Sequence, residues 1–342
     1  MTIQKEAPKK AHENLFGHVN YHDEIHEDIH ADKKVDGYWK KAAKTLLKNK
    51  WAMFSLISIL FLVVMSLVGP AMTSYTYKDQ DVTRAFLPPK IPALADIHWL
   101  PFDGYADGVD QYELMGVEEA FWFGTDQFGR DQWTRVWYGT RISLLIAFIA
   151  SIIDVCVGVT YGGISGYFGG RTDNIMQRII EVLVGIPNLV IIILAIIVLK
   201  PGLLSIIIAI VLTGWVSMAR VIRGQVLKLR NMEYVLASKT LGLSNSTILI
   251  KDILPNSMAQ IIITTMFTIP GAIFFEAFLS FIGLGLPAPM ASLGTVINDG
   301  FESLQIYPYL VLFPSLIISL LLVNFNLLGD GLRDALDPKM KQ

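Results

Sequence analysis

Residues 231–256 read NMEYVLASKTLGLSNSTILIKDILPN and form a polar island between two hydrophobic runs. The first half of this island contains good helix formers, and Gly242 is the residue that can adopt the left-handed turn which ends such a helix. Ser244 or Asn245 can then cap the free amides of a second helix. The stretch therefore predicts two short helices with a sharp turn between them. One apolar stripe is expected on the second helix, made by Leu249, Ile250, Ile253 and Leu254.

The flanking hydrophobic runs hold this island against one face of a membrane, and its charge indicates which face. Basic residues exceed acidic ones, as is typical of a short cytoplasmic loop. A basic helical pair on that side can lie on anionic lipid, dock into another protein, or simply be a solvated loop. Over the whole loop 220–258 the basic residues are Arg220, Arg223, Lys228, Arg230, Lys239 and Lys251, against Glu233 and Asp252.

The composition of the whole chain indicates an integral membrane protein rather than a soluble enzyme. Of its 342 residues 53% are hydrophobic, and the mean hydropathy is +0.48. The net charge of −2 conceals a segregation of charge by segment. A single cysteine, Cys156, excludes an intrachain disulfide.

Six transmembrane helices are predicted from length and scarcity of charge. The lysines that precede the first span place the N-terminus in the cytoplasm, and six spans return the C-terminus to the same side. No cleavable signal pattern is present in the N-terminal region. The spans are expected at 51–72, 142–164, 179–199, 203–219, 259–286 and 309–329. The expected segments are a cytoplasmic tail at 1–50, a first transmembrane helix at 51–72, an extracytoplasmic loop at 73–138, a five-helix membrane domain at 139–330 and a cytoplasmic tail at 331–342.

The N-terminal tail carries a histidine at every fourth position, at His18, His22, His26 and His30. On a helix these imidazoles share a face, and such pairs can chelate zinc or nickel. No companion cysteine or defined cage accompanies them, so a solvated tail is the preferred interpretation and no metal site is assigned.

A second motif, FGTDQFGRDQWTRVWYGTRISLL at 123–145, places acidic and basic residues around three glycines just before the second span. This spacing fits a tight turn pinned by Asp–Arg pairs, and a structural latch is the favoured interpretation. Its candidate residues are Gly124, Asp126, Gly129, Arg130, Asp131, Arg135 and Arg141.

Polar residues inside the predicted spans are the candidates for a translocation path. Asp154 and Glu276 lie centrally in their spans, and Asn324 adds a polar group to the last one. A charge at the centre of a spanning helix costs about 2.5–3.5 kcal/mol, so such residues face a bundle interior or an aqueous path. Hydrogen bonding between helices is preferred over direct contact with substrate, but both remain open. Glu181, one turn from Arg178, is expected to pair with it.

The chain carries no motif for chemistry. The glycine-rich stretch TYGGISGYFGG at 160–170 lacks the Lys and Ser/Thr of a phosphate-binding loop and has no dinucleotide-binding spacing. HExxH, GxSxG and CxxC are also absent from the sequence. The chain is therefore expected not to be an enzyme.

The opening stretch resembles the signature loop of binding-protein-dependent ABC importer permeases, whose motif reads EAA, three residues, Gly, and a later hydrophobic-Leu-Pro end. Leu236 stands where the motif has Glu, Ser238 where it has its second Ala, and Asp252 where it has Ile. Glu233 lies three residues upstream, as is common in the oligopeptide and dipeptide branch. The residues that carry the match, and to which the resemblance assigns coupling to an ATPase, are Glu233, Ala237, Ser238, Gly242, Leu254 and Pro255.

The second motif resembles the GTD-x-x-GRD-x-x-x-R-x-x-x-G-x-R-x-SL signature of the C-type permease subunit of oligopeptide, dipeptide and nickel ABC importers. EAFLSFIGLGLPAPMASLG at 276–294 and FNLLGDGLRDALDP at 325–338 agree with the same family. The resemblance covers the chain from about residue 37 to its end, and three separated motifs in the right order make it specific. Beside the candidate residues above, Thr125, Gly139, Ser143 and Leu144 match.

The resemblance implies an all-α, type I ABC importer permease in the cell membrane of a bacterium. It implies a paralogous second permease subunit, two cytoplasmic ATPase subunits that hold ATP and magnesium, and an extracytoplasmic solute-binding protein that delivers a peptide. This chain would bind no cofactor and no nucleic acid. A permease for nickel or another small solute remains an alternative within the family, and a secondary transporter or channel is an alternative outside it.

Overall fold

The computed structural model describes residues 37–95 and 101–336, so the four tail histidines lie outside the described residues. The chain divides into two compact units, Met1–Ala43 and Lys44–Gln342. Helix α2 (Tyr38–Lys48) crosses the boundary between them in the sequence, and the second unit contains the helices long enough to span a membrane.

Among the described residues, five helices are long and apolar enough to cross a membrane, and a bent pair makes a sixth candidate. The first begins at an Asn49 cap, whose side chain accepts hydrogen bonds from the amides of Trp51 and Ala52. The last two contain Pro270 and Pro314 within their length. Their bounds are α3 (Lys50–Val68), α5 (Gln132–Phe168), α8 (Leu203–Leu229), α11 (Met258–Leu279) and α13 (Tyr309–Leu336), with the bent pair α6 (Gly170–Gly185) and α7 (Asn188–Leu199).

The third expected span, 179–199, is not one straight helix. It is interrupted after Gly185, and α6 and α7 meet at 84°. Pro187 is the cause, because proline lacks an amide hydrogen and pushes the preceding residue out of the helical region. Ile186 accordingly has an extended backbone, with φ −98° and ψ 131°.

The second span is longer than expected at both ends. It begins at Gln132, not at residue 142, and continues to Phe168, so the segment expected as a loop at 165–178 is helical on both sides of Gly169. The glycine-rich stretch lies in this helix as far as Phe168, and Gly158, Gly162 and Gly166 of the helix face α8. A Cβ at Gly162 would collide with the carbonyl oxygen of Ala219, so these glycines let two helix backbones approach closely.

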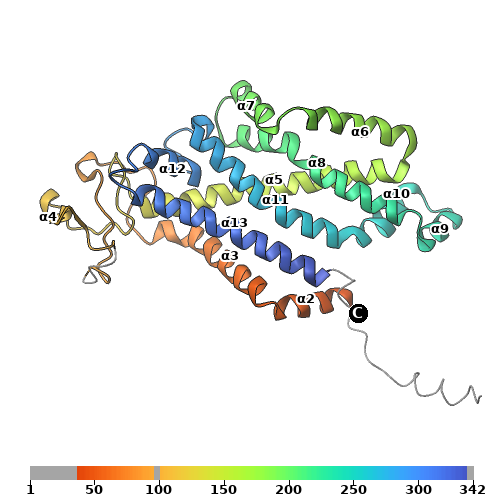
Figure 1. Ribbon diagram of the computed structural model, residues 1–342, viewed down its shortest axis with the longest axis horizontal. Helices are drawn as coiled ribbons and strands as arrows, with labels where there is room; N and C mark the ends of the chain where they lie inside the picture. Colours follow the sequence, from red (N-terminus) through yellow and green to blue (C-terminus); the bar gives the residue numbers. More distant parts are fainter. Residues whose placement is uncertain (1–36, 96–100, 337–342) are drawn as a thin grey trace, which may run out of the picture. The chain divides into compact units, whose positions relative to one another are not determined.

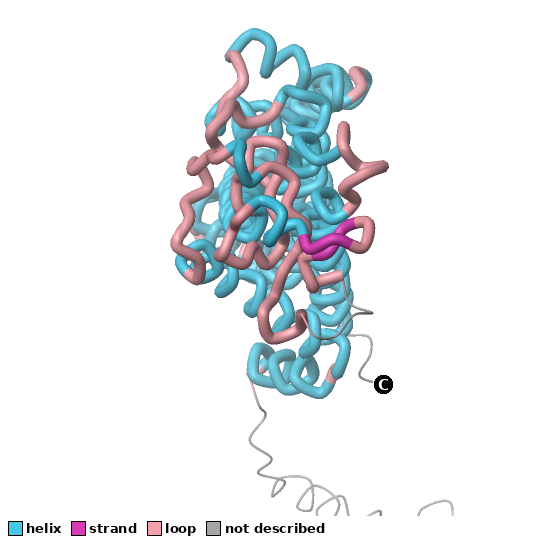
Figure 2. Tube along the Cα trace, turned by 90° about the vertical axis from the view of Figure 1, so that its left-hand side faces the viewer, coloured by secondary structure: helices cyan, strands magenta, loops and turns pink. Residues whose placement is uncertain are grey.

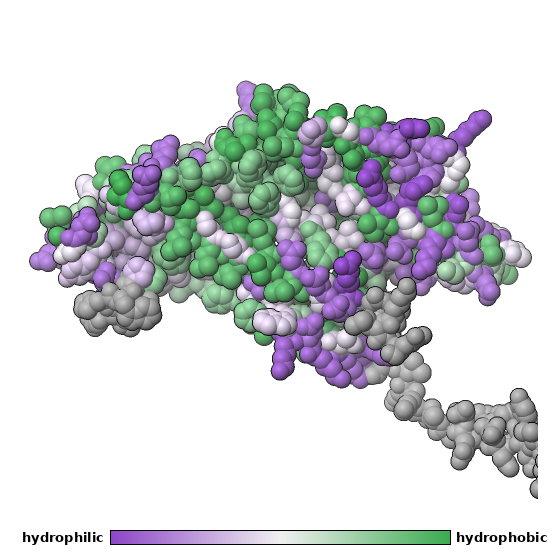
Figure 3. All heavy atoms as spheres, in the orientation of Figure 1, coloured by the Kyte–Doolittle hydropathy of each residue, from purple (hydrophilic) through white to green (hydrophobic). Residues whose placement is uncertain are grey.

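The membrane helices pack side by side around one core. Figure 1 shows α5 between α8 and α11, with α13 beside α11 and α3 beside α13. The central core draws buried residues from all of these helices, among them Ile146, Ile206, Ile273 and Leu321. Hydrophobic residues cover the middle of the helices on the face drawn in Figure 3, and hydrophilic residues gather around the end of the bundle that carries α9. This distribution suits a bundle whose two ends are in water and whose middle is in lipid.

Irregular structure gathers at one end, called here the α12 end. Figure 2 shows its loops and the small hairpin lying over the helix ends. Helix α12 is fixed by a capping box, in which the Ser292 side chain accepts from the Thr295 amide and the Thr295 side chain accepts from the Ser292 amide. The elements at this end are η1 (Gly69–Ala71), η2 (Val82–Arg84), β1 (Tyr105–Ala106), β2 (Val109–Asp110), α4 (Gln111–Met115), η5 (Ser280–Leu284) and α12 (Leu293–Phe301).

The opposite end, called here the α9 end, carries the stretch 231–256. It contains four consecutive short elements that join α8 to α11 (Figure 1). They are α9 (Glu233–Thr240), α10 (Asn245–Thr247), η3 (Ile248–Ile253) and η4 (Pro255–Ser257).

Candidate functional site

The turn at Gly242 ends α9 as the sequence predicts. Gly242 has φ +79°, and its amide donates to the Lys239 carbonyl at 3.0 Å while the Leu243 amide donates to the Ser238 carbonyl at 3.2 Å. These are the two hydrogen bonds of a Schellman cap, which requires a left-handed residue. Ser244 then caps the next helix by accepting from the Thr247 amide at 3.2 Å. Two short helices therefore meet at a fixed angle.

The outer surface of this helical pair is apolar although it lies at a polar end of the molecule. Leu241 is 81% exposed, and Tyr234 and Leu236 are each more than 40% exposed. Ala237 is exposed between them, and Ser238 is half-buried, so no large side chain blocks the approach of a partner. An exposed apolar patch with a polar rim is typical of a protein interaction site. We call this surface, defined by Tyr234, Leu236, Ala237, Leu241 and Leu243, the α9 surface.

The apolar stripe expected on the second helix differs in the structure. Ile250 is 61% exposed, while Ile248, which the expected stripe omits, is fully buried with Ile253. The reason is that η3 is a π-helix, in which the Leu254 amide donates to the Leu249 carbonyl, five residues earlier. The wider turn changes the spacing of buried positions from three and four residues to five.

The inner side of the helical pair is packed onto the ends of the spanning helices. Val235 and Ile253 join Ile222 and Val226 of α8 and Tyr167 of α5 in one buried cluster. Leu254 packs against this cluster, and Pro255 begins η4, which leads into α11. The stretch is therefore packed against the ends of α5 and α8 and is continuous with α11.

Polar contacts join the ends of α5, α6 and α8, and one of them reaches the stretch 231–256 itself. Arg223 of α8 forms a two-pronged ion pair with Asp173 of α6, with both nitrogen–oxygen distances 2.6 Å. Asp173 also accepts from Ser165 of α5 at 2.5 Å. Arg230 donates to the carbonyl of Gly166 at 2.9 Å, and Tyr167 donates to the side chain of Asn245 at 2.9 Å. Of the coupling candidates, Glu233, Ala237, Gly242 and Pro255 are exposed, and Ser238 and Leu254 are half-buried.

At the α12 end the second motif forms a buried ion-pair cluster. Arg130 pairs with Asp126 at 2.6 Å, and both it and Arg135 reach Asp299 of α12, at 2.8 and 2.7 Å. Arg135 also approaches Asp126 at 3.6 Å. The turn is thus pinned by Asp–Arg pairs as the sequence predicts, and Asp299 joins it from a segment about 160 residues later.

The other residues of this motif fix the start of α5. Asp131 caps the helix through the amides of Trp133 and Thr134, and burial raises the pKa of its carboxyl. Arg141 donates to the carbonyls of Ser66 and Leu67 at the end of α3, both at 3.0 Å. Gly124 and Gly129 have φ values of +77° and +66° and lie against backbone of the preceding loop. The motif joins three segments of the α12 end.

Inside the bundle, Glu276 is enclosed and hydrogen-bonded. Its carboxylate accepts from Ser143 at 2.6 Å and from Ser280 at 2.8 Å, and its side chain is fully buried. Asn324 donates to Ser58 at 3.0 Å and to the Leu320 carbonyl at 2.7 Å. Both residues connect neighbouring helices. Arg178 and Glu181 form the expected exposed pair at 2.7 Å.

Asp154 differs from Glu276. It is 2% exposed, and its Oδ1 atom has no hydrogen-bond partner among the described residues. It lines a cavity of about 250 Å³ between α5, α7, α8 and α11. The structure therefore does not bring the three polar candidates of the spans together into one site.

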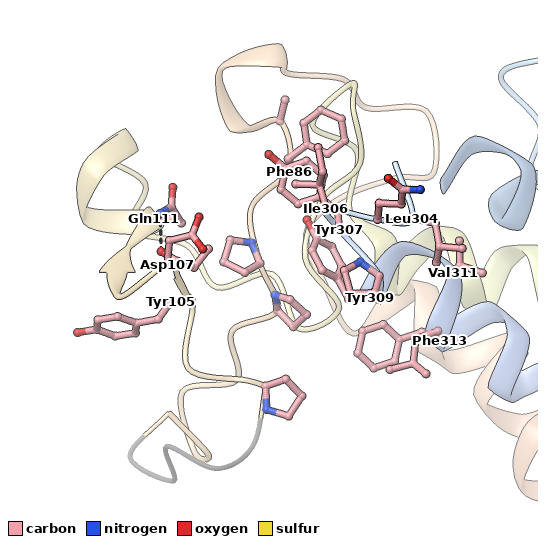
Figure 4. Close-up of a pocket in the computed structure, with 18 of the residues that line it drawn as sticks. Phe86, Tyr105, Asp107, Gln111, Leu304, Ile306, Tyr307, Tyr309, Val311 and Phe313 are labelled. Atoms are coloured by element: carbon pink, nitrogen blue, oxygen red, sulfur yellow. Dashed lines mark hydrogen bonds between the residues drawn. The ribbon is translucent and has the colours of Figure 1, made fainter. Parts of the chain in front are cut away.

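A larger pocket of about 1070 Å³ opens at the α12 end (Figure 4). Aromatic side chains line part of it, with Phe86 stacked on Tyr307 at 4.3 Å between ring centres. Asp107 and Gln111 lie on the opposite side from Tyr309 and Phe313. None of these residues was singled out by sequence, because the pocket forms only when the 73–131 loop meets the start of α13.

Two further functional features were missed from the sequence. Asp299 belongs to no motif that can be recognised in the sequence. The one sign of it is Arg135, the second arginine of the 123–145 motif, which needs a further carboxylate as its partner. The glycine stripe of α5 was recognisable, since its glycines recur every four residues, which is typical of close helix packing in membranes.

Two family models match the chain. One, described as "Binding-protein-dependent transport system inner membrane component", matches residues 158–342. The other, described as "N-terminal TM domain of oligopeptide transport permease C", matches residues 37–89.

Curated relatives match over nearly their full length. The dipeptide transport system permease protein DppC of Bacillus subtilis is 47% identical over 306 residues, which is 89% of this chain and 87% of the relative. The oligopeptide transport system permease protein OppC of the same organism is 44% identical over 310 residues, covering 91% and 92%. DppC of Lactococcus lactis is 42% identical over 316 residues, covering 89% and 92%. Among solved structures, an inward facing MetNI methionine ABC transporter chain is similar at a TM-score of 0.49 and 14% identity, covering 58% of this chain and 94% of that chain.

Proposed function

The chain belongs to the family of binding-protein-dependent transport system inner membrane components, and on this premise we propose that it is the permease subunit of an ABC importer that carries peptides into the cytoplasm. It is a multi-pass protein of the inner membrane. The relatives named above are dipeptide and oligopeptide permeases, which favours peptides over nickel or another small solute.

The observation that carries the mechanism is the α9 surface. Its apolar side chains are exposed on one side, and on the other side Val235 is buried against the ends of α5 and α8. Such an element can convert a movement of a bound partner into a movement of the helices around the path. We assign the α9 end to the cytoplasm, because its basic residues exceed its acidic ones.

The proposed partners follow from this arrangement. Two cytoplasmic ATPase subunits hold ATP and magnesium and one of them receives the α9 surface, so this chain itself catalyses no reaction. A related second permease completes the path. An extracytoplasmic solute-binding protein delivers the peptide at the α12 end, where the pocket of Figure 4 is open to it.

The coupling assignment is tested by Ala237→Glu, which places a bulky charge on the α9 surface without altering a buried residue. We expect the variant to insert normally but to lose co-purification of the ATPase subunits. Val82→Glu is the matched control, because Val82 is a 70% exposed apolar residue at the opposite end. Equal recovery of the ATPases with Ala237→Glu and with the control would contradict the assignment.

A further inference from the structure

The cavity beside Asp154 lies among the spanning helices, and its largely apolar wall contains five oxygen-bearing side chains. It has a volume of about 250 Å³, and Asp154 supplies the one carboxylate among its lining residues. Two of the residues that line it, Asn188 and Ser217, are exposed on the surface of this chain, so the cavity opens to that surface. The neutral polar residues that line it are Asn188, Ser217, Thr264 and Thr268.

The Asp154 carboxylate is buried without a partner. It is 2% exposed, and Oδ1 accepts no hydrogen bond from the described residues. Glu276, in the same bundle, accepts hydrogen bonds from two serines and lines none of the three cavities described here. A buried carboxylate that stays charged needs a cation or several donors, and within the described residues Asp154 is given neither. A group that enters the cavity can therefore supply the partner that the Asp154 carboxylate lacks.

Gly214 of α8 makes room for this carboxylate. A Cβ at that position would lie 2.7 Å from Oδ1 and closer still to Oδ2 of Asp154. Gly214 also borders a second cavity, of about 510 Å³, which shares Asn188 and Ser217 with the first. The charged residue on the wall of the second cavity is Arg220. The two adjoining cavities thus present one negative and one positive side chain.

The chemistry of the first cavity selects a singly charged group that donates hydrogen bonds. One carboxylate among hydroxyl and amide oxygens matches an ammonium, which donates in three directions. A divalent metal ion would take six or more oxygen ligands, usually from several carboxylates. The described residues contain no cluster of three or more potential metal-binding side chains. A peptide carries an α-ammonium at one end and a carboxylate at the other, matching the charges of the two cavities.

From this geometry we infer that the Asp154 cavity binds the α-ammonium group of the transported peptide. The inference rests on the proposed peptide transport and adds a contact site within the membrane. It replaces, for Asp154, the expectation of hydrogen bonding between helices, while Glu276 keeps that role.

The test compares tri-alanine with a free and with an acetylated N-terminus. Uptake is measured in proteoliposomes that hold the complete importer, with both peptides supplied at concentrations that load the binding protein equally, as verified by a separate binding measurement. The wild-type importer should prefer the free peptide. In Asp154→Asn this preference should fall by about tenfold, the contribution of one charge-assisted hydrogen bond. The same binding protein serves both importers, so its own preference cancels.

Two matched variants isolate the effect. Asp154→Glu keeps the carboxylate and should retain most of the preference. Glu276→Gln removes the other buried carboxylate and should leave the preference unchanged, whatever it does to the overall rate. An unchanged preference in Asp154→Asn, or an equal fall in Glu276→Gln, would overturn the inference.

A further variant serves if Asp154→Asn does not assemble. Ser217→Phe places a bulky side chain at an exposed wall of the cavity and changes no buried residue. It should also reduce the preference for the free peptide, and an unchanged preference would again overturn the inference. A wild-type importer that takes up neither peptide would instead contradict the proposed function itself.

Discussion

Arg135 is a charged residue whose side chain is only 1% exposed. Its buried charge is stabilised by the two carboxylates that face it. Asp126 has the same exposure and also binds Arg130. Removing one member of such a cluster leaves the others buried and unbalanced. The cost is therefore larger than the small stabilisation that an exposed pair contributes.

We accordingly expect Asp126→Asn to destabilise the protein by about 3–5 kcal/mol, the range for a buried pair broken on one side. Glu181→Gln is the matched control, because its pair with Arg178 has a similar distance, 2.7 Å, but exposures of 82% and 55%. The control should change stability by less than about 1 kcal/mol. Thermal unfolding of the detergent-solubilised protein measures both. Equal losses would show that burial does not decide the strength of these pairs.

Gly242 is the second residue whose identity the structure explains. Its φ of +79° is strained for a β-branched side chain, although a Cβ there meets no atom within 4 Å. Gly242→Val should therefore cost about 1–3 kcal/mol locally and change the angle between α9 and α10. We expect it to abolish substrate-stimulated ATP hydrolysis while leaving insertion intact.

Asparagine tolerates left-handed backbone better than other residues, so Gly242→Asn should retain most of the stimulated hydrolysis. If valine and asparagine behave alike, backbone conformation at this turn is not what coupling requires.

At the scale of elements, glycines let α5 and α8 approach closely along part of their contact. Gly162 lies against the backbone of Ala219, whereas a Cβ added at the adjacent Gly163 would have no neighbouring atom nearer than 3.7 Å. Adding a methyl group at the first position must separate the helices, and at the second it fits.

Gly162→Ala should consequently destabilise the protein by about 1–3 kcal/mol, as overpacking does, while Gly163→Ala should be neutral or slightly stabilising. The difference in thermal unfolding temperature between the Gly162→Ala and Gly163→Ala variants measures the effect of the close contact between α5 and α8. Similar unfolding temperatures for both variants would contradict the close packing of α5 and α8.

The elements also show which features a sequence reveals. Hydropathy and turn chemistry predicted the spans, the end of α9 at Gly242 and the cap at Ser244. The same criteria missed the bend at Pro187, since an apolar window of 21 residues looks continuous even when a proline interrupts it. They also misplaced the stripe of η3, because a π-helix changes the repeat without changing the composition.

At the scale of the whole molecule, sequence motifs identified the ends of the bundle better than its interior. The motifs at 123–145 and 231–256 are local, so their residues were found together. Asp154 and Glu276 look alike in sequence, because each is one acidic residue in an apolar run. Only tertiary packing distinguishes them, since Ser143 of α5 donates a hydrogen bond to Glu276 and a cavity adjoins Asp154.

The central claim is that this chain forms part of a transport path, and that an ATPase bound at the α9 surface drives transport through it. Reconstituted transport tests this claim most directly. The chain is placed in proteoliposomes with its second permease, the two ATPase subunits and the binding protein, and accumulation of labelled tri-alanine is measured. The account predicts accumulation that requires both ATP and the ATPase subunits. Accumulation driven by an ion gradient in their absence would contradict it, because that is the behaviour of a secondary transporter.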